Sequence, residues 1–311
     1  MEEYDLIIIG AGVSGLAGGM YSARLGLKTL ILGASSESEM PVGGTITVTN
    51  FVENYPGFIR ISGIELAEKM RKHAEIYDLA TIKQEKANDI RKKGGKFLVK
   101  TDEKEYLGKS VLFATGTKWR DLEIPGGKEF KHRGVNYCAL CDAALYKNKT
   151  VCVVGGSDVA VRDALILSEY AKKVYIIYRK EKVRAEQANL ELAEKNERIE
   201  IIKNTNVLEV KGKDFVESVV LDKKYKGKKE LKLDGVFVAI GHVALSELAE
   251  KLGVKLNLKD EIIIDRKTSK TNVEGIFGAG DVTDRPFKQV IIGVSEACVA
   301  AHSAYEYCSN K

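Results

Sequence analysis

A strand followed by a glycine-rich turn and a helix occurs twice in this chain and constrains its fold more than any other feature. The first copy consists of the apolar run 5–9, the motif Gly10-x-Gly12-x-x-Gly15 and a helical stretch at 16–25. In such a turn the first glycine permits a tight bend and the second lets the backbone approach a pyrophosphate. The third lets the helix pack on the strand. This placement predicts a dinucleotide site near the start of the chain.

One feature of that site is missing from the sequence. The second strand ends in Leu32-Gly33, where an acid for the ribose is expected. Glu37 or Glu39, just beyond, is the candidate substitute. The alternative interpretation is a generic glycine turn that binds nothing.

The second copy is a degraded form of the same pattern. The strand at 150–154 leads into Gly155-x-Ser157-x-x-Ala160, and a helix and a strand at 173–178 follow. Ser157 adds a Cβ where the backbone should approach phosphate most closely, whereas alanine is accepted at the third position.

Cations stand at the end of the next strand in this second copy. Arg179, Lys180 and Arg184 occupy the region where an acid would select NAD. Guanidinium and ammonium groups pair with phosphate, so the sequence favours NADPH through its ribose 2′-phosphate. The alternative is a solvated basic strand end in a lysine-rich chain.

The two copies predict an α/β protein with two nucleotide-binding domains. Stretches that alternate or are rich in β-formers predict antiparallel strands beside the parallel sheets, and a Lys/Glu-rich stretch predicts a solvated hairpin. These segments are 96–101, 199–210 and 216–221 for the strands, and 222–232 for the hairpin.

A C-x-x-C pair precedes the second nucleotide motif. Cys138 and Cys141 have the spacing of a disulfide that forms and breaks, and Asp142 could return a proton to a departing thiolate. Asp142 could equally cap a helix that begins at Ala143. A zinc site would need two more ligands, and Cys152 lies in an apolar strand, so we expect no metal. Inert core thiols are a further alternative.

Composition excludes several classes of protein. The 311 residues are 44% hydrophobic and 30% charged, which is ordinary for a folded chain of about two domains. A net charge of +5 is too dispersed to indicate nucleic acid, and no apolar run suits a membrane helix. The five cysteines do not form a secreted framework and the acidic N-terminus is no signal peptide, so we expect a cytoplasmic protein.

Two nucleotide folds and a redox pair suggest electrons that pass from a nicotinamide through a flavin to a disulfide. On these residues the chain resembles the low-molecular-weight thioredoxin reductases over nearly its whole length. The most specific match is G-V-N-Y-C-A-L-C-D at 134–142. The other matching segments are 43–49, 52–57, 114–116, 178–184, 237–242, 278–282 and 287–290. The resemblance implies two Rossmann-like, three-layer ββα dinucleotide-binding domains, the second inserted into the first. The first domain would be formed by 1–118 and 242–311 and the second by 119–241.

The resemblance implies which residues bind each cofactor. For FAD they are Gly10, Gly12, Gly15, Gly43, Gly44, Thr45, Thr47, Asn54, Ala114, Thr115, Gly116, Gly280, Asp281, Lys288, Gln289 and Val290. For NADPH they are Gly156, Ser157, Asp158, Val159, Arg179, Lys180, Arg184, Ile240 and Gly241.

The resemblance also implies a mechanism. Cys141 would face the flavin, Cys138 would attack the disulfide of thioredoxin or a thioredoxin-like protein, and Asp142 would be the general acid. The family expectation is a homodimer in which the NADPH domain rotates against the FAD domain during turnover.

Some positions depart from the family pattern. Ser157 stands where glycine is usual, and Gly18 and Gly19 lie inside the first helix at a cost of about 1 kcal/mol each relative to alanine. Because Ser157 bears on the electron donor, a flavin disulfide reductase with a deazaflavin or ferredoxin donor is an alternative. A flavin-bearing thiol redox sensor and a structural zinc protein are two others.

Overall fold

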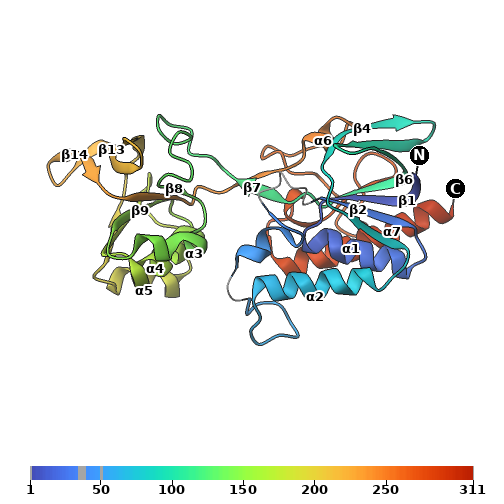
Figure 1. The fold of residues 1–311 in the computed structure, drawn as a ribbon, viewed down its shortest axis with the longest axis horizontal. Coiled ribbons are helices and arrows are strands. Elements are labelled where there is room, and N and C mark those ends of the chain that lie inside the picture. The colour runs from blue at the N-terminus through green and yellow to red at the C-terminus, as the bar shows by residue number, and fades with distance from the viewer. Residues whose placement is uncertain (1, 34–39, 50–51, 311) are drawn as a thin grey trace. The chain divides into compact units, whose positions relative to one another are not determined.

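The computed structural model describes residues 2–33, 40–49 and 52–310, and the chain divides into two compact units. The first unit is formed by Met1–Lys118 and Val243–Lys311, and the second by Trp119–His242. The chain passes into the second unit at strand β7 (Thr117–Trp119) and returns at β16 (His242–Ala244). These two strands pair with each other (Figure 1). The second unit is therefore an insertion within the first.

A seven-stranded sheet forms the centre of the first unit. Its strand order is β3-β2-β1-β6-β5-β4, and β17 pairs with β6. Strands β1, β2, β3, β6 and β17 are parallel, whereas β4, β5 and β6 form an antiparallel meander. The strands are β1 (Glu2–Ile9), β2 (Thr29–Leu32), β3 (Ala80–Lys83), β4 (Ala87–Lys93), β5 (Lys96–Thr101), β6 (Glu105–Phe113) and β17 (Ile276–Gly278).

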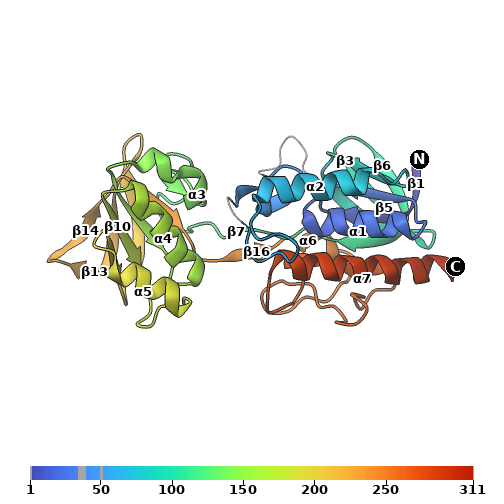
Figure 2. The same cartoon turned by 90° about the horizontal axis from the view of Figure 1, so that it is seen from below.

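Helices cover one face of this sheet. Helices α1, α2 and α7 lie side by side there (Figure 2). Leu6 and Ile8 of β1 face the apolar cluster beneath α1 and α7, whereas Ile7 and Ile9 face a second cluster that includes Ala249 of α6. The helices are α1 (Val13–Arg24), α2 (Gly63–Glu75), α6 (Glu247–Glu250) and α7 (Val290–Ser309), with single 3₁₀ turns η1 (Gly44–Val48) and η3 (Gly280–Val282).

The second unit has a five-stranded parallel sheet of order β11-β10-β9-β15-β8. One core cluster joins it to the helices and another to a three-stranded antiparallel sheet, β12-β13-β14. The strands are β8 (Val135–Asn136), β9 (Thr150–Val154), β10 (Lys173–Ile177), β11 (Ile199–Ile202), β12 (Val207–Gly212), β13 (Val216–Tyr225), β14 (Lys228–Lys232) and β15 (Gly235–Val238). The helices are α3 (Ala139–Asp142), the 3₁₀ turn η2 (Ala143–Tyr146), α4 (Asp158–Tyr170) and α5 (Gln187–Lys195).

The predicted fold class is confirmed, with one correction among the strands. The stretch 199–210 was expected to be antiparallel, but its first part, β11, is parallel to β10 and extends the central sheet. Only β12, at its end, is antiparallel. The hairpin predicted at 222–232 is confirmed. Its strands β13 and β14 are joined by Lys226 and Gly227, which both have positive φ, the geometry of a tight hairpin turn.

Candidate active site

The glycine turn after β1 brings two of the predicted FAD segments together. Gly12 forms a parallel bridge with Gly43, whose N–H donates to the carbonyl of Ala11 at 2.8 Å. A Cβ on Gly15 would lie 1.8 Å from the Gly10 carbonyl, so packing alone requires that glycine. A Cβ on Gly12 would lie 3.8 Å from its nearest protein atom, in ordinary contact. Packing against the protein therefore does not require glycine at position 12, whereas a ligand that approaches the backbone would require it.

The first turn of α1 fits an anion. Gly12 is the N-cap of α1 and supplies no side-chain hydrogen bond to the first N–H groups of the helix. Those donors have no partner within the helix and suit a phosphate. Gly10, at the start of the turn, lies against Ala114 at the end of β6, where a Cβ would be 2.2 Å from the Ala114 carbonyl.

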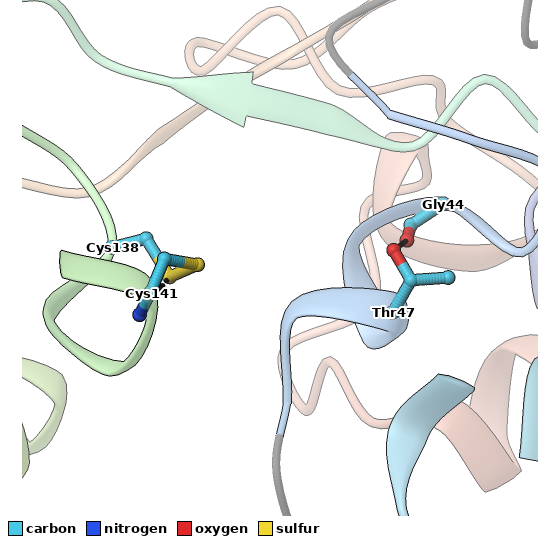
Figure 3. The surroundings of a disulfide bond; sticks show 4 residues. All are labelled: Gly44, Thr47, Cys138 and Cys141. Carbon is cyan, nitrogen blue, oxygen red and sulfur yellow. Dashed lines mark hydrogen bonds between the residues drawn. A yellow bond between two sulfur atoms is a disulfide. The ribbon is translucent and has the colours of Figure 1, made fainter. Parts of the chain in front are cut away.

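Other predicted FAD residues pair within the first unit. The Asn54 amide donates to the Gln289 side chain at 2.9 Å, and Gln289 is the N-cap of α7, which begins at Val290. The Thr47 hydroxyl donates to the Gly44 carbonyl at 2.7 Å (Figure 3). Segments far apart in the sequence thus meet beside the glycine turn.

Three further predicted residues, Thr45, Thr115 and Gly116, make no hydrogen bonds with one another in the described part of the chain. Thr45 is exposed in η1, and its side chain makes no hydrogen bond to any described residue. Thr115 donates its hydroxyl to the Leu245 carbonyl at 2.6 Å, and the Gly116 carbonyl accepts from the Leu245 N–H at 3.0 Å. The substitute ribose acids Glu37 and Glu39 lie outside the described residues.

A buried carboxylate holds the turn at Gly280. Glu296 of α7 is 4% exposed, and its Oε2 accepts from the Gly280 N–H at 2.9 Å and the Thr283 hydroxyl at 3.1 Å. Its Oε1 pairs with Arg285. Burial raises the pKa of Glu296, and the Gly280 hydrogen bond and Arg285 oppose that rise. The carboxylate fixes the turn that carries Asp281.

Lys288 also binds this turn, through two backbone carbonyls. Its ammonium donates to the carbonyls of Asp281 at 2.7 Å and Thr283 at 2.8 Å, and pairs with Glu261 at 2.7 Å. An ammonium has three donors, and these partners use all of them. The Lys288 side chain therefore shapes the turn and has no donor left for a cofactor.

Sequence reasoning missed Ser14 and Glu296. A Cβ on Gly280 would lie 2.6 Å from the Ser14 hydroxyl oxygen, and one on Gly293 would lie 2.4 Å from it. The hydroxyl thus sits where α1, η3 and α7 converge. Glu296 had a visible signal, since it is the only charged residue in the long run of apolar and small residues at 290–301.

The redox pair lies on a helical turn in the second unit. Cys138 and Cys141 form a disulfide with their Cα atoms 5.3 Å apart (Figure 3). Cys138 is the N-cap of α3, and its Sγ accepts from the Cys141 N–H at 3.1 Å. Cys138 is half-buried and Cys141 is exposed. A partner disulfide can therefore reach this pair.

Asp142 ends the same turn and is half-buried. Burial raises the pKa of its carboxyl, and His132 opposes the rise. Asp142 occupies the N-cap position of the turn that begins at Ala143, as expected, but its side chain makes no capping hydrogen bond to that turn. A carboxyl with a raised pKa beside a disulfide suits a proton donor.

Buried polar groups lie beneath this turn. The Asn136 amide donates to the Tyr146 hydroxyl at 2.7 Å, and Tyr146 is 7% exposed. A Cβ on Gly235 would lie 2.3 Å from the Tyr146 ring, so this glycine admits the ring against β15. Burial raises the pKa of the Tyr146 hydroxyl.

An aromatic ring packs directly against the second glycine turn. A Cβ on Gly156 would lie 2.3 Å from the ring of Tyr178, which is 6% exposed. The Tyr178 hydroxyl is buried and has no hydrogen-bond partner in the described part of the chain. Ser157 is the N-cap of α4 without a side-chain capping bond, and Val159 in the first turn is exposed. The first turn of α4 therefore keeps donors for an anion.

The predicted cations follow β10. Arg179, Lys180 and Arg184 are exposed, and within residues 2–33, 40–49 and 52–310 none is paired with a carboxylate. The Arg184 N–H donates to the Gly156 carbonyl at 2.8 Å, which brings this loop to the glycine turn. Ile240 follows β15, and the Gly241 carbonyl accepts from a backbone N–H at 2.9 Å.

The side chain of Asp158, in the first turn of α4, is engaged within the protein. Its Oδ1 accepts from the backbone N–H of Glu186 at 3.0 Å and from the Asn189 amide at 2.9 Å. Its carboxylate therefore binds the protein's own loop.

The remaining thiols lie apart from this chemistry. Cys152 is fully buried in β9, and burial raises its pKa. Cys298 lies in α7 beside the apolar cluster under α1. Among the described residues no three His, Cys, Asp or Glu side chains are grouped as a metal ion would require, and no described helix is long and apolar enough to cross a membrane.

Residues 4–302 match the pyridine nucleotide-disulphide oxidoreductase family. The chain is 39% identical to the thioredoxin reductase of Treponema pallidum (strain Nichols), covering 98% of this chain and 97% of that one. The structure is similar to thioredoxin reductase from Lactococcus lactis, with a TM-score of 0.90 and 35% identity over 99% of this chain and 100% of that chain. It is also similar to a ferredoxin-flavin thioredoxin reductase from Clostridium acetobutylicum, with a TM-score of 0.54, 32% identity and 100% of each chain covered.

Proposed function

The chain belongs to the pyridine nucleotide-disulphide oxidoreductases, among the thioredoxin reductases, and we propose that it uses NADPH and bound FAD to reduce thioredoxin or a thioredoxin-like protein. The observation that carries the proposal is the accessible Cys138–Cys141 disulfide in a unit with its own nucleotide-type glycine turn. A thiol pair that only stabilised the fold would not need an exposed sulfur beside a carboxyl of raised pKa.

The first unit has the features that FAD requires. When bound, the flavin accepts a hydride from the nicotinamide and passes electrons to the disulfide. Gly12 and the first turn of α1 would hold the pyrophosphate, and the turn at Asp281 would meet the ribitol. The packing at Gly12 supports this assignment, because a Cβ there would make only ordinary contacts and packing does not require glycine.

The second unit has the features that NADPH requires. The first turn of α4 would hold the pyrophosphate, and Arg179, Lys180 and Arg184 would hold the 2′-phosphate. Exposed cations without a carboxylate partner support this role, because nothing in the described chain neutralises them.

The reduced cysteine pair would act by thiol–disulfide exchange. The Cys138 thiolate attacks one sulfur of the partner disulfide, which forms a mixed disulfide and releases one partner thiolate. Asp142 gives that thiolate its proton. The Cys141 thiolate then attacks the sulfur of Cys138, which restores the Cys138–Cys141 disulfide and releases the second partner sulfur as a thiolate that takes a proton from water.

A different electron donor is the second candidate. Ser157 carries a hydroxymethyl group at the position where the backbone should approach phosphate most closely. One similar structure is that of a ferredoxin-flavin thioredoxin reductase. On this reading the flavin and cysteine chemistry is unchanged and the donor is reduced ferredoxin or a deazaflavin.

Steady-state reduction of thioredoxin by the holoprotein distinguishes the two candidates. We expect turnover with NADPH, slower turnover with NADH, and none in a Cys138→Ser variant. Turnover with reduced ferredoxin and none with NADPH would replace the first candidate by the second. No disulfide reduction with any donor would leave the redox sensor.

Three wider expectations stay predictions. They are a homodimer, a cytoplasmic location and rotation of the second unit against the first in each turnover. Sedimentation velocity measures the first. A dependence of kcat on solvent viscosity tests the third, since motion of a whole domain is slowed by friction.

A further inference from the structure

The loop that carries the cations is fastened to the start of α4 by one carboxylate oxygen. Asp158 Oδ1 accepts from the Glu186 N–H at 3.0 Å and from the Asn189 amide at 2.9 Å. Asp158 is the first residue of α4, and Asn189 lies in α5. We name this pair the Asp158–Asn189 latch and residues 179–186 the basic loop.

A second backbone contact holds the basic loop at Arg184. The Arg184 N–H donates to the Gly156 carbonyl at 2.8 Å, and Arg184 forms a parallel bridge with Ser157. The loop is therefore held by its backbone against the glycine turn, which leaves the guanidinium of Arg184 exposed.

Apolar packing holds the middle of the basic loop. Val183 is 5% exposed and belongs to the core cluster of the parallel sheet and its helices, and Ala185 packs against that cluster. An open pocket of about 270 Å³ borders the loop and α5. It is lined by Glu181, Lys182, Val183, Leu190, Glu194 and Lys203. The hydrogen bonds of Glu186 and Arg184 add to this packing in determining where the ends of the loop lie.

The charges on the basic loop make that restraint useful. Arg179, Lys180 and Arg184 have no carboxylate partner in the ranges that the structure describes. Like charges held close together repel one another, and a loop free to move would spread them apart. A doubly charged phosphate binds more tightly to cations that are already gathered, because binding then orders less of the loop.

We propose that the Asp158–Asn189 latch positions the basic loop for the 2′-phosphate and so sets the preference of this protein for NADPH over NADH. The inference rests on the proposed use of NADPH. It gives Asp158 a positioning role in place of the ligand role expected from the sequence, and it adds Asn189, which no motif indicated. Asn189 contacts the nucleotide site only through Asp158 and the end of the basic loop in the described residues, so its loss should weaken binding of the 2′-phosphate more than binding of the rest of the nucleotide.

Binding of two nucleotide fragments to the oxidised holoprotein tests the latch without turnover. The probes are 2′,5′-ADP, which has the 2′-phosphate, and 5′-AMP, which lacks it, and calorimetry measures both. We expect Asn189→Ala to weaken binding of 2′,5′-ADP by about 3- to 10-fold, less than the full effect of a hydrogen bond to a charged group because the loop keeps its other contacts, and to leave 5′-AMP within about 2-fold. Alanine favours the helix at this position, so we expect the variant to fold.

Gln187→Ala is the matched control. Gln187 lies on the same helix, and among the described residues its side chain bonds only Glu191, at 2.8 Å, so both probes should bind as in the parent protein. Hydrogen exchange gives a second readout, in which the Glu186 amide should exchange faster in Asn189→Ala than in Gln187→Ala.

The outcomes separate the latch from the proposed function. A parent protein that prefers 2′,5′-ADP and an Asn189→Ala variant that prefers it equally would overturn the latch alone. Equal weakening of both probes would also overturn it, because the effect would not be specific to the 2′-phosphate. A parent protein that binds the two probes equally would overturn the 2′-phosphate site together with the latch.

Discussion

At the scale of single residues, Glu296 shows how a buried charge can shape a binding turn. It is nearly inaccessible, yet its carboxylate has partners from Gly280, Thr283 and Arg285. A buried carboxylate is tolerated only when it is paired and hydrogen-bonded. Its partners flank Asp281, so the stability of the first unit and the shape of the proposed ribitol site are coupled.

Glu296→Gln tests that coupling. The amide can still accept the Gly280 hydrogen bond, but Arg285 loses its counter-charge. We expect the free energy of unfolding of the first unit to fall by about 1–3 kcal/mol and FAD to bind more weakly. Denaturant unfolding and FAD titration of the apoprotein measure the two effects. Glu306→Gln, at an exposed site on the same helix, is the control, and equal effects of both variants would contradict the role of Glu296.

Substitution of each cysteine tests whether the pair serves the chemistry or the fold. Cys138→Ser and Cys141→Ser each remove one sulfur from a short turn that is partly exposed. We expect either change to abolish disulfide reduction and to leave the FAD content unchanged, since the turn belongs to the other unit. Activity assays and visible spectra of the purified variants measure this. FAD loss in either variant would mean that the pair is structural.

The Asp142 carboxyl predicts a pH dependence. Because burial raises its pKa, the acid stays protonated to a higher pH than an ordinary aspartate and can donate to a leaving thiolate. Disulfide reduction should slow as the pH rises through that pKa. In Asp142→Asn the rate should fall by about 100-fold or more, the scale of general-acid catalysis, and the pH profile of the variant should lack this step. The same step in the variant would assign the proton to another group.

Sequence reasoning at this scale found residues that belong to local patterns. The glycines of the first turn and the two cysteines are recognisable from spacing within a few residues. Ser14, Glu296 and Asn189 were missed because their roles depend on partners far along the chain or on another element. Lys288 was assigned to FAD, whereas its ammonium is used by the protein itself.

At the scale of elements, the two glycines inside α1 have a packing reason. A Cβ on Gly19 would lie 2.1 Å from the Ile31 side chain, and one on Gly18 would lie 3.0 Å from Leu112. Both neighbours are fully buried, so they cannot move aside freely. The helix gives up about 1 kcal/mol per glycine in propensity and lies closer to the sheet in return. The sequence showed the departure but not this contact.

Helix α4 contains an acid whose ionisation opposes folding. Burial raises the pKa of Asp163 from 3.8 to about 7, and Arg162 opposes the rise. The folded state therefore holds the proton more tightly than the unfolded state, and stability falls as the pH rises from 3.8 to 7. Asp163→Asn removes that cost.

We expect the Asp163→Asn variant to unfold at a higher temperature than the parent protein above pH 7. The gain should be about 2–4 °C for each kcal/mol, and it should vanish well below pH 4. Calorimetry across this pH range measures it, with Asp158 left intact to preserve the latch. A gain that does not depend on pH would show that ionisation of Asp163 is not its cause.

The strand order was only partly open to prediction. The parallel strands β1, β2, β9 and β10 were predicted because glycine turns and helices separate them. Strand β11 was expected to be antiparallel because its residues resemble those of β12, and direction depends on the preceding helix α5 rather than on composition.

At the scale of the whole molecule, the repeated strand–turn–helix pattern was enough to predict two nucleotide folds, and the resemblance to a known family implied that one is inserted in the other. Each unit buries separate core clusters on the two faces of its own sheet. Each unit can therefore form its own glycine turn, and the redox pair lies in the unit proposed to bind NADPH. The electron donor was less predictable, because it depends on loop placement and on Ser157.

The central claim is that NADPH delivers electrons to the Cys138–Cys141 disulfide. Its most direct test is an anaerobic titration of the holoprotein with NADPH, in which free thiols are alkylated and located by peptide mass spectrometry. The account predicts that Cys138 and Cys141 become alkylated together as NADPH is consumed, and that oxidised thioredoxin restores the disulfide. NADPH consumed while that disulfide stays intact would contradict it.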